Sequence, residues 1–218
     1  MPGRIANSEH APPIEALRVG QRAVFLDKDG TLVRDVPFNV DPARIALMPG
    51  VGSGLRALFD AGYRLCVVSN QPGVAMGLFP RVALAAVGAR ISELAGEAGA
   101  AIDGYYWCPH PVLRGEQVKL ACVCRKPMPG LLQMAAHQRG LDLRRSWMVG
   151  DILDDVEAGH RAGCRAILVN SGGETLWGAG LHRTPDAMVS RFDLAVRFIL
   201  DADMPSRSTQ DLARRELR

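Results

Sequence analysis

Short apolar runs rich in β-branched residues recur along the chain, separated by segments with apolar residues every three or four positions. The runs lie at 23–26, 65–68, 102–107, 146–149 and 166–169, and their length is typical of buried strands. Helical spacing occupies 50–61, 81–94, 130–139, 154–161 and 191–201. Strands that alternate with helices favour a mainly parallel sheet with helices on both faces. The pattern therefore predicts an α/β fold.

One interval interrupts this alternation. Residues 107–126 contain prolines, a glycine, cysteines and a histidine, but no amphipathic pattern. A loop of that length in a compact domain is usually functional or held in place by something. We expect one domain over 23–205 that contains this loop, preceded by an N-terminal arm over 1–22 and followed by a polar C-terminal tail over 206–218.

Composition and charge exclude several classes of protein. Of 218 residues, 48% are hydrophobic and 22% charged, which are globular values, and the net charge is only +3. Lysine and arginine form no block, so we expect no nucleic-acid partner. The apolar stretches are too short to span a membrane, and 1–21 lacks the features of a signal peptide, so we expect no membrane partner and a cytoplasmic location. No amphipathic element is left for an interface, so a monomer is expected.

Polar side chains follow the ends of the first two predicted strands. Asp27 and Asp29 follow 23–26, while Ser69-Asn70-Gln71 follows 65–68. In open α/β sheets ligands bind beyond the carboxyl ends of the strands. There, Asp27 can attack an electrophile or bind a hard cation while Asp29 moves a proton. The hydroxyl and amide groups of the second cluster suit phosphate oxygens.

Two further groups complete the chemistry. Arg125 and Lys126 set two cations side by side, one suited to bidentate oxyanion contacts and the other a compact point charge. Asp151 follows the 146–149 run, and Asp154 and Asp155 come shortly after it. If a helix begins there, Asp151 and Asp155 lie one turn apart.

This set of residues matches what phosphoryl transfer through an aspartyl-phosphate needs. A carboxylate nucleophile and an anionic phosphate repel each other, so a divalent cation must lie between them. Oxygen-only ligation suits Mg²⁺. Lys126 and Ser69 can stabilise charge on the equatorial phosphoryl oxygens.

Four segments resemble, in order, the motifs of the haloacid dehalogenase (HAD) superfamily of phosphatases: Asp27-Lys28-Asp29-Gly30-Thr31, Ser69-Asn70-Gln71, Arg125-Lys126-Pro127 and Gly150-Asp151-Ile152-Leu153-Asp154-Asp155. The resemblance implies a Rossmann-like fold, with Asp27 as nucleophile and Asp29 as general acid and then base. It also implies Mg²⁺ held by Asp27, the Asp29 carbonyl and Asp151. No inserted segment fits the superfamily's cap domain, so none is expected. For Asp154 and Asp155, a metal-shell or loop-ordering role and simple charging of a helix N-terminus remain alternatives.

A second cluster lies inside the irregular interval. It consists of two pairs of metal-ligand residues, Cys108 with His110 and Cys122 with Cys124. Three thiolates and one imidazole make a closed tetrahedral zinc shell with no position for catalytic water, so we assign a structural Zn²⁺ that pins the loop and aims the cations that follow. The alternative is a pair of buried thiols plus a surface histidine.

Cys-x-His, a loop, then Cys-x-Cys-Arg-Lys-Pro narrows the resemblance to the zinc-containing branch that includes heptose-bisphosphate and histidinol-phosphate phosphatases. The branch implies a small phosphorylated metabolite as substrate, with Arg125 at its remote end or second phosphate. Residues 35–38, in particular Asp35 and Phe38, and the amides of Asn70 and Gln71 would contact that substrate. Ile152 stands where the branch carries a basic residue.

Within this branch a heptose bisphosphate is the first expectation, and histidinol phosphate or another sugar phosphate is the rival. A non-catalytic binding member of the same fold is the alternative from a different class. The intact set of acids, hydroxyl and lysine favours an enzyme.

Overall fold

The computed structural model describes residues 20–112, 122–175 and 177–203. Most of the expected N-terminal arm, the middle of the 107–126 loop and the expected tail lie outside the described residues. The strands form one parallel sheet of order β3-β2-β1-β4-β5-β6. Their bounds are β1 Ala23–Leu26, β2 Arg64–Asn70, β3 Gly104–Cys108, β4 Trp147–Gly150, β5 Arg165–Val169 and β6 Ala187–Val189.

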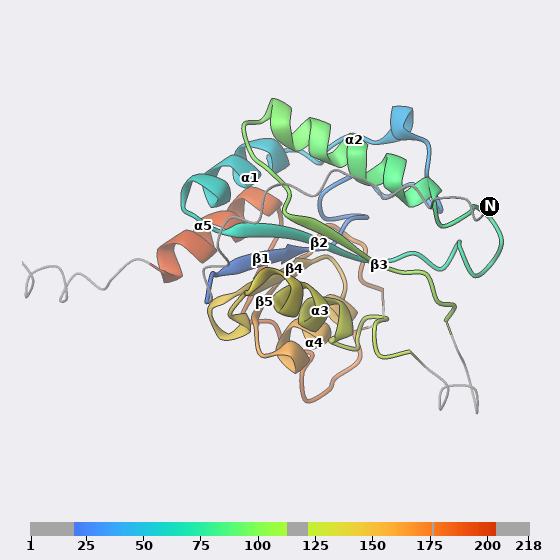
Figure 1. Ribbon diagram of the computed structural model, residues 1–218. Coiled ribbons are helices and arrows are strands. Elements are labelled where there is room, and N and C mark those ends of the chain that lie inside the picture. The colour runs from blue at the N-terminus through green and yellow to red at the C-terminus, as the bar shows by residue number, and fades with distance from the viewer. Residues whose placement is uncertain (1–19, 113–121, 176, 204–218) are drawn as a thin grey trace, which may run out of the picture.

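The α-helices of the described residues cover the two faces of this sheet: Figure 1 shows α1, α2 and α5 on one side and α3 and α4 on the other. Their bounds are α1 Val51–Asp60, α2 Ala83–Glu97, α3 Gly130–Arg139, α4 Leu153–Ala162 and α5 Phe192–Ala202, with short 3-10 helices at Pro42–Arg44 and Leu143–Arg145. The predicted α/β class with a parallel, doubly covered sheet is confirmed. No described helix has the length and apolar character needed to cross a membrane.

Strand β1 is the centre of the core. Val24 and Leu26 pack into the apolar cluster beneath α1, α2 and α5, while Ala23 and Phe25 pack into the cluster beneath α3 and α4, and all four are fully buried. A strand buried on both faces reads as a continuous apolar run. The residue that follows it, Asp27, is therefore carried on a strand that is buried on both faces.

Close packing of α1 on α5 depends on Gly54. A Cβ there would lie 2.8 Å from the Phe192 ring and 3.0 Å from Val196. Gly96, in α2, has nothing within 4 Å of the same position. We expect Gly54→Ala to lower the free energy of unfolding by about 1–3 kcal/mol through overpacking, which outweighs the gain in helix propensity of about 1 kcal/mol. Gly96→Ala, its matched control, should raise it by about 0.4–1 kcal/mol. Urea unfolding measures both, and equal effects would contradict the packing argument.

A group of hydrogen bonds to Asp203, which we call the Asp203 tie, joins the amino edge of the sheet to the end of α5. Asp203 accepts hydrogen bonds from the Tyr63 hydroxyl, from Arg165 at 2.8 Å and from Arg22 at 2.9 Å. Burial alone raises the pKa of Asp203, but these hydrogen bonds and charges hold it below its ordinary value. A carboxyl with a depressed folded pKa stabilises the fold above its unfolded pKa, and that stability is lost as the pH falls through the folded pKa.

Asp203→Asn should therefore cost about 1–3 kcal/mol of unfolding free energy at pH 7. The difference from the wild type should shrink as the pH is lowered below about 4, because the wild-type carboxyl then becomes protonated as well. Urea unfolding at pH 7, 5 and 3.5 provides the comparison. A difference that stays constant over this range would show that the charge of Asp203 is not what stabilises the tie.

Candidate active site

A buried lysine joins the first candidate residues at the carboxyl edge of the sheet. Lys126 is 2% exposed, and its Nζ lies 2.5 Å from Asp27 Oδ1, 2.5 Å from Asp155 Oδ1 and 2.9 Å from the Val68 carbonyl oxygen. Burial alone lowers the pKa of Lys126, but the two carboxylates raise it overall, so the ammonium stays charged. Ser69, at the end of β2, is also buried beside this group.

Three buried carboxylates face that one lysine. Oxygen atoms of Asp27, Asp151 and Asp155 all lie within 4.8 Å of one another. Burial, with the neighbouring charges of Asp27 and Asp155, raises the pKa of Asp151 to about 8. Burial and the Asp27 charge also raise the pKa of Asp155, to about 7, against the attraction of Lys126. Carboxyl groups therefore outnumber Lys126 here, and a cation that favours their ionised form could bind among them.

Glycines keep the space around Asp151 free. A Cβ on Gly30 or on Gly173 would overlap Asp151 Oδ2. Ser171 Oγ donates to the Gly30 carbonyl oxygen at 3.3 Å, and the Leu153 amide at the start of α4 donates to a Glu174 carboxylate oxygen at 2.6 Å. The 171–174 segment thus forms one wall of the site. This wall is not among the predicted site residues, although a Ser-Gly-Gly step one residue after a predicted strand is a signal of close backbone approach.

Asp29 is held by two donors. Lys28 Nζ lies 2.5 Å from its Oδ1, and Gln71 Nε2 donates to its Oδ2 at 3.1 Å. Gln71 also donates to Ser69 Oγ at 3.1 Å. Burial raises the pKa of Asp29, although Lys28 partly opposes that shift. Lys28 is not among the predicted site residues.

The Asn70 side chain forms two hydrogen bonds with the main chain of Lys126. Its Oδ1 accepts from the Lys126 amide at 3.0 Å, and its Nδ2 donates to the Lys126 carbonyl at 3.1 Å. In this structure the carboxamides of Asn70 and Gln71 both hold protein groups. Their expected contact with substrate stays a prediction.

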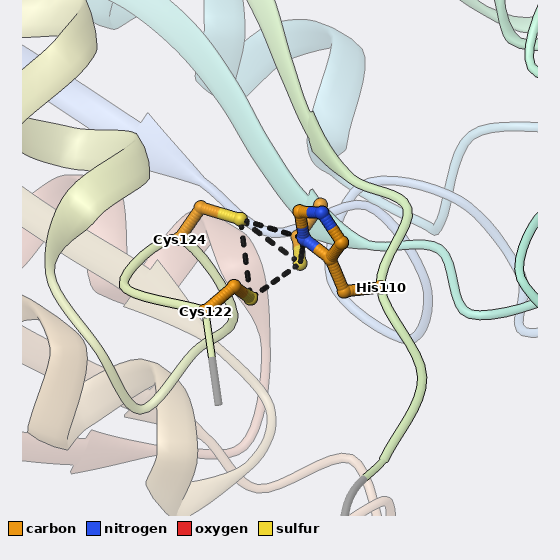
Figure 2. A group of neighbouring side chains, drawn as sticks. His110, Cys122 and Cys124 are labelled. Atoms are coloured by element: carbon orange, nitrogen blue, oxygen red, sulfur yellow. Dashed lines mark hydrogen bonds between the residues drawn. The ribbon is translucent and has the colours of Figure 1, made fainter. Parts of the chain in front are cut away.

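The four ligand atoms of Cys108, His110, Cys122 and Cys124 converge on one point, and we call these residues the Cys/His cluster. Sulfur–sulfur distances are 3.3, 3.3 and 3.6 Å, and His110 Nδ1 lies 3.2 Å from Cys124 Sγ and 3.5 Å from Cys108 Sγ. Figure 2 shows the labelled side chains pointing toward one another. The geometry could hold a metal ion. Residues 113–121, between the two pairs, lie outside the described residues.

Arg125 contacts two residues of the Cys/His cluster and directly precedes Lys126. Its amide donates to Cys122 Sγ at 3.3 Å, and its guanidinium donates to the His110 carbonyl oxygen at 3.3 Å. Burial raises the pKa of Cys122, but the hydrogen bonds from Cys124 and the Arg125 amide lower it overall, which favours the thiolate. A thiolate is the form that binds metal. Since Lys126 follows directly, the cluster and the buried lysine lie on one short segment.

Two predicted substrate contacts lie on the exposed 35–38 segment. Asp35 and Phe38 are exposed, and Phe38 has φ 55°, an uncommon conformation for a bulky residue. A Cβ on Gly73 would lie 3.2 Å from the Phe38 ring, so that ring rests on the loop after β2. Their contact with substrate stays a prediction.

Asp154 and Asp155, for which two roles remained open, have different surroundings in the structure. Asp155 is completely buried against Lys126, and its Oδ2 accepts from the Ile152 amide at 3.3 Å. Asp154 instead pairs with Arg183 at 2.9 Å. Helix phase places one acid inside the site and the other outside it.

Known proteins resemble this chain over most of its length. A family model described as HAD-hydrolase-like matches residues 123–194. D-glycero-beta-D-manno-heptose-1,7-bisphosphate 7-phosphatase of Haemophilus ducreyi is 35% identical over 81% of this chain and 97% of its own, and the Thermosynechococcus vestitus enzyme of that activity is 38% identical over 81% and 94%.

Solved structures agree. The D,D-heptose 1,7-bisphosphate phosphatase of B. bronchiseptica, complexed with magnesium and phosphate, matches with a TM-score of 0.71 at 27% identity over 84% of this chain and 99% of its own. A putative HAD-like phosphatase from Mesorhizobium loti matches with a TM-score of 0.72 at 31% identity, over 95% and 94%.

The parallel sheet and the acid–lysine group at its carboxyl edge define a HAD-like phosphatase, a hydrolase of phosphoric monoesters. Within that class, relatives that align with four-fifths of the chain at 35–38% identity identify the family. The chain belongs to the family of D-glycero-D-manno-heptose-1,7-bisphosphate 7-phosphatases.

Proposed function

We propose that the protein removes the 7-phosphate of D-glycero-D-manno-heptose 1,7-bisphosphate through an aspartyl-phosphate on Asp27. The observation that carries the reaction type is the ion pair of Asp27 with the buried Lys126, 2.5 Å apart at the end of the central strand. The substrate rests on the relatives named for it, which align with 81% of the chain. Arg125, beside the Cys/His cluster, is proposed to contact the far end of the sugar or its second phosphate.

The residues divide the reaction between them. Asp27 attacks phosphorus, the bond from phosphorus to the sugar oxygen breaks, and Asp29 gives that oxygen its proton. Asp29 then takes a proton from a water molecule, which attacks phosphorus and breaks the bond to Asp27, releasing phosphate. Lys126 and Ser69 bind the equatorial oxygens, where charge accumulates in both transition states.

Mg²⁺ is the proposed partner of the carboxylate site, held by Asp27, Asp151 and the Asp29 carbonyl. The donors are all oxygen, and the three carboxyl groups of the cluster outnumber Lys126, the lysine that contacts two of them. The two glycines that border Asp151 leave space beside its carboxylate. When bound, the ion would neutralise the repulsion between Asp27 and the phosphoryl group. Asp155, fully buried against Lys126, is proposed to fix that lysine rather than to bind the ion.

Zn²⁺ is the proposed occupant of the Cys/His cluster, in a structural role. Zinc bonds of about 2.3 Å to sulfur put the corners of the tetrahedron roughly 3.8 Å apart. The observed separations of 3.2–3.6 Å approach that figure. Four protein ligands leave no position for a reacting water. The five cysteines, all within the described residues, form no disulfide, which suits a reducing compartment, and we propose a cytoplasmic monomer.

A phosphate-release screen with Mg²⁺ tests the substrate. The panel is the 1,7-bisphosphate, the corresponding 1- and 7-monophosphates, and histidinol phosphate. The bisphosphate should have the highest kcat/KM, and the product should keep its 1-phosphate. A preference for histidinol phosphate would overturn the substrate assignment. A chain that hydrolyses none of them, nor p-nitrophenyl phosphate, would instead be a binding member of the fold.

A further inference from the structure

Lys28 is a buried cation to which the proposed reaction gives no part. Its side chain is 3% exposed, and its Nζ lies 2.5 Å from Asp29 Oδ1. Burying an ammonium is costly unless it is paired, and within the described ranges Asp29 is the acid that pairs with it. Its backbone is fixed as well, since the Lys28 carbonyl accepts from the amides of Leu32 and Val33, both at 3.0 Å. The cation therefore stands on a closed turn.

The other oxygen of Asp29 is held from a different element. Gln71 Nε2 donates to Asp29 Oδ2 at 3.1 Å. The Gln71 amide itself donates to the carbonyl of Cys108 at 2.7 Å, which ties it to the end of β3. Lys28 and Gln71, on separate parts of the chain, thus each contact one oxygen of the Asp29 carboxylate. Together the two contacts fix the rotation of that carboxylate about its Cβ–Cγ bond.

We propose that Lys28 is a positioning residue that orients the Asp29 carboxylate for both of its proton transfers. The proposal rests on the aspartyl-phosphate mechanism above. Lys28 gains and loses no proton in it: the proton passes between Asp29 and the sugar oxygen in the first step, and between water and Asp29 in the second. What Lys28 supplies is the direction in which the carboxylate points.

The two steps depend differently on that direction. With p-nitrophenyl phosphate the leaving nitrophenolate needs no proton, so Asp27 can be phosphorylated without help from Asp29. Hydrolysis of the phosphoenzyme still needs Asp29 to activate water. Loss of orientation should therefore slow the second step selectively, and a structural defect would slow both.

The experiment compares the wild type with Lys28→Met in the full-length protein with Mg²⁺. Each protein is phosphorylated with p-nitrophenyl phosphate, and the substrate is then diluted away. Samples are quenched in acid at intervals, and mass spectrometry measures the fraction of protein that is still phosphorylated. We expect a phosphoenzyme lifetime roughly 10- to 100-fold longer than in the wild type, because a misplaced catalytic group costs about that much. The rate of the first nitrophenolate release should change little.

Two further variants make the result specific. Lys28→Arg keeps a cation near Asp29 and should recover most of the lost rate. Arg22→Met removes a partly buried cation from the Asp203 tie, at the opposite edge of the sheet, and should leave the lifetime unchanged. If Lys28→Met does not fold, Lys28→Gln takes its place under the same criteria.

The proposal is overturned if the lifetime stays within twofold of the wild type, or if phosphorylation and hydrolysis slow equally. A wild-type protein that never forms a phosphoenzyme would instead overturn the proposed function, and this proposal with it.

Discussion

Asp27→Asn is expected to abolish phosphatase turnover while the protein remains folded. A carboxamide of the same shape cannot attack phosphorus, and removal of the group that forms a covalent intermediate should lower kcat by at least about 10³-fold. The fold should survive because Lys126 keeps Asp155 and the Val68 carbonyl as partners, at 2.5 and 2.9 Å. Phosphate release with Mg²⁺ measures the activity, and thermal unfolding measures the fold.

Asp60→Asn is the matched control for that variant. Asp60 ends α1 and pairs with Arg56 on the exposed surface, so the same chemical change there should leave kcat unaltered. Near-normal turnover in Asp27→Asn would contradict a mechanism through Asp27.

Cys122→Ser is expected to abolish binding of the proposed zinc by the Cys/His cluster and to weaken the fold. A serine hydroxyl stays protonated and is a poor zinc ligand, and the binding free energy of a structural zinc is part of the folding free energy. We expect unfolding to cost at least about 3 kcal/mol less than in the wild type. Activity should fall too, because Arg125 and Lys126 follow the cluster directly. Elemental analysis should find one zinc bound by the wild type and none by the variant.

Cys164→Ala tests whether these losses belong to the cluster. Cys164 is a buried thiol between α4 and β5, outside the four ligands, and its replacement should leave the metal content unchanged. Wild-type protein that contains no zinc and yet unfolds at the same urea concentration as zinc-loaded protein would contradict the structural role.

The sheet was predictable where burial is complete on both faces. β1, β2, β4 and β5 are covered by helices on both sides and read as uninterrupted apolar runs. β6 was missed because it is a three-residue edge strand with half-exposed side chains, and Met188 at its centre is 56% exposed. Such a strand has no apolar run for a pattern to detect.

The candidate site was predictable where a rule ties chemistry to strand ends. Asp27 and Asp151 follow β1 and β4, Ser69 is the second-last residue of β2, and the sheet brings those strand ends together. The part played by Asp155 depends on helix phase and on a lysine from a separate loop, which no local pattern contains. Lys28 was missed for a related reason, since a lysine between two aspartates reads as a solvated charge until the tertiary structure buries it.

The central place of β1 has a consequence for how the protein is made. The groups that meet the carboxyl end of β1 come much later in the chain. Lys126 is 99 residues beyond Asp27, and Asp151 is 120 residues beyond Thr31. At about 5–20 residues per second, a ribosome needs roughly 6–24 s to add those 120 residues. Until then the nascent β1 lacks β4 and the carboxylates of Asp151 and Asp155, so an arrested chain that ends before α4 should bind no substrate. Asp27, the proposed nucleophile, is therefore synthesised long before it can react.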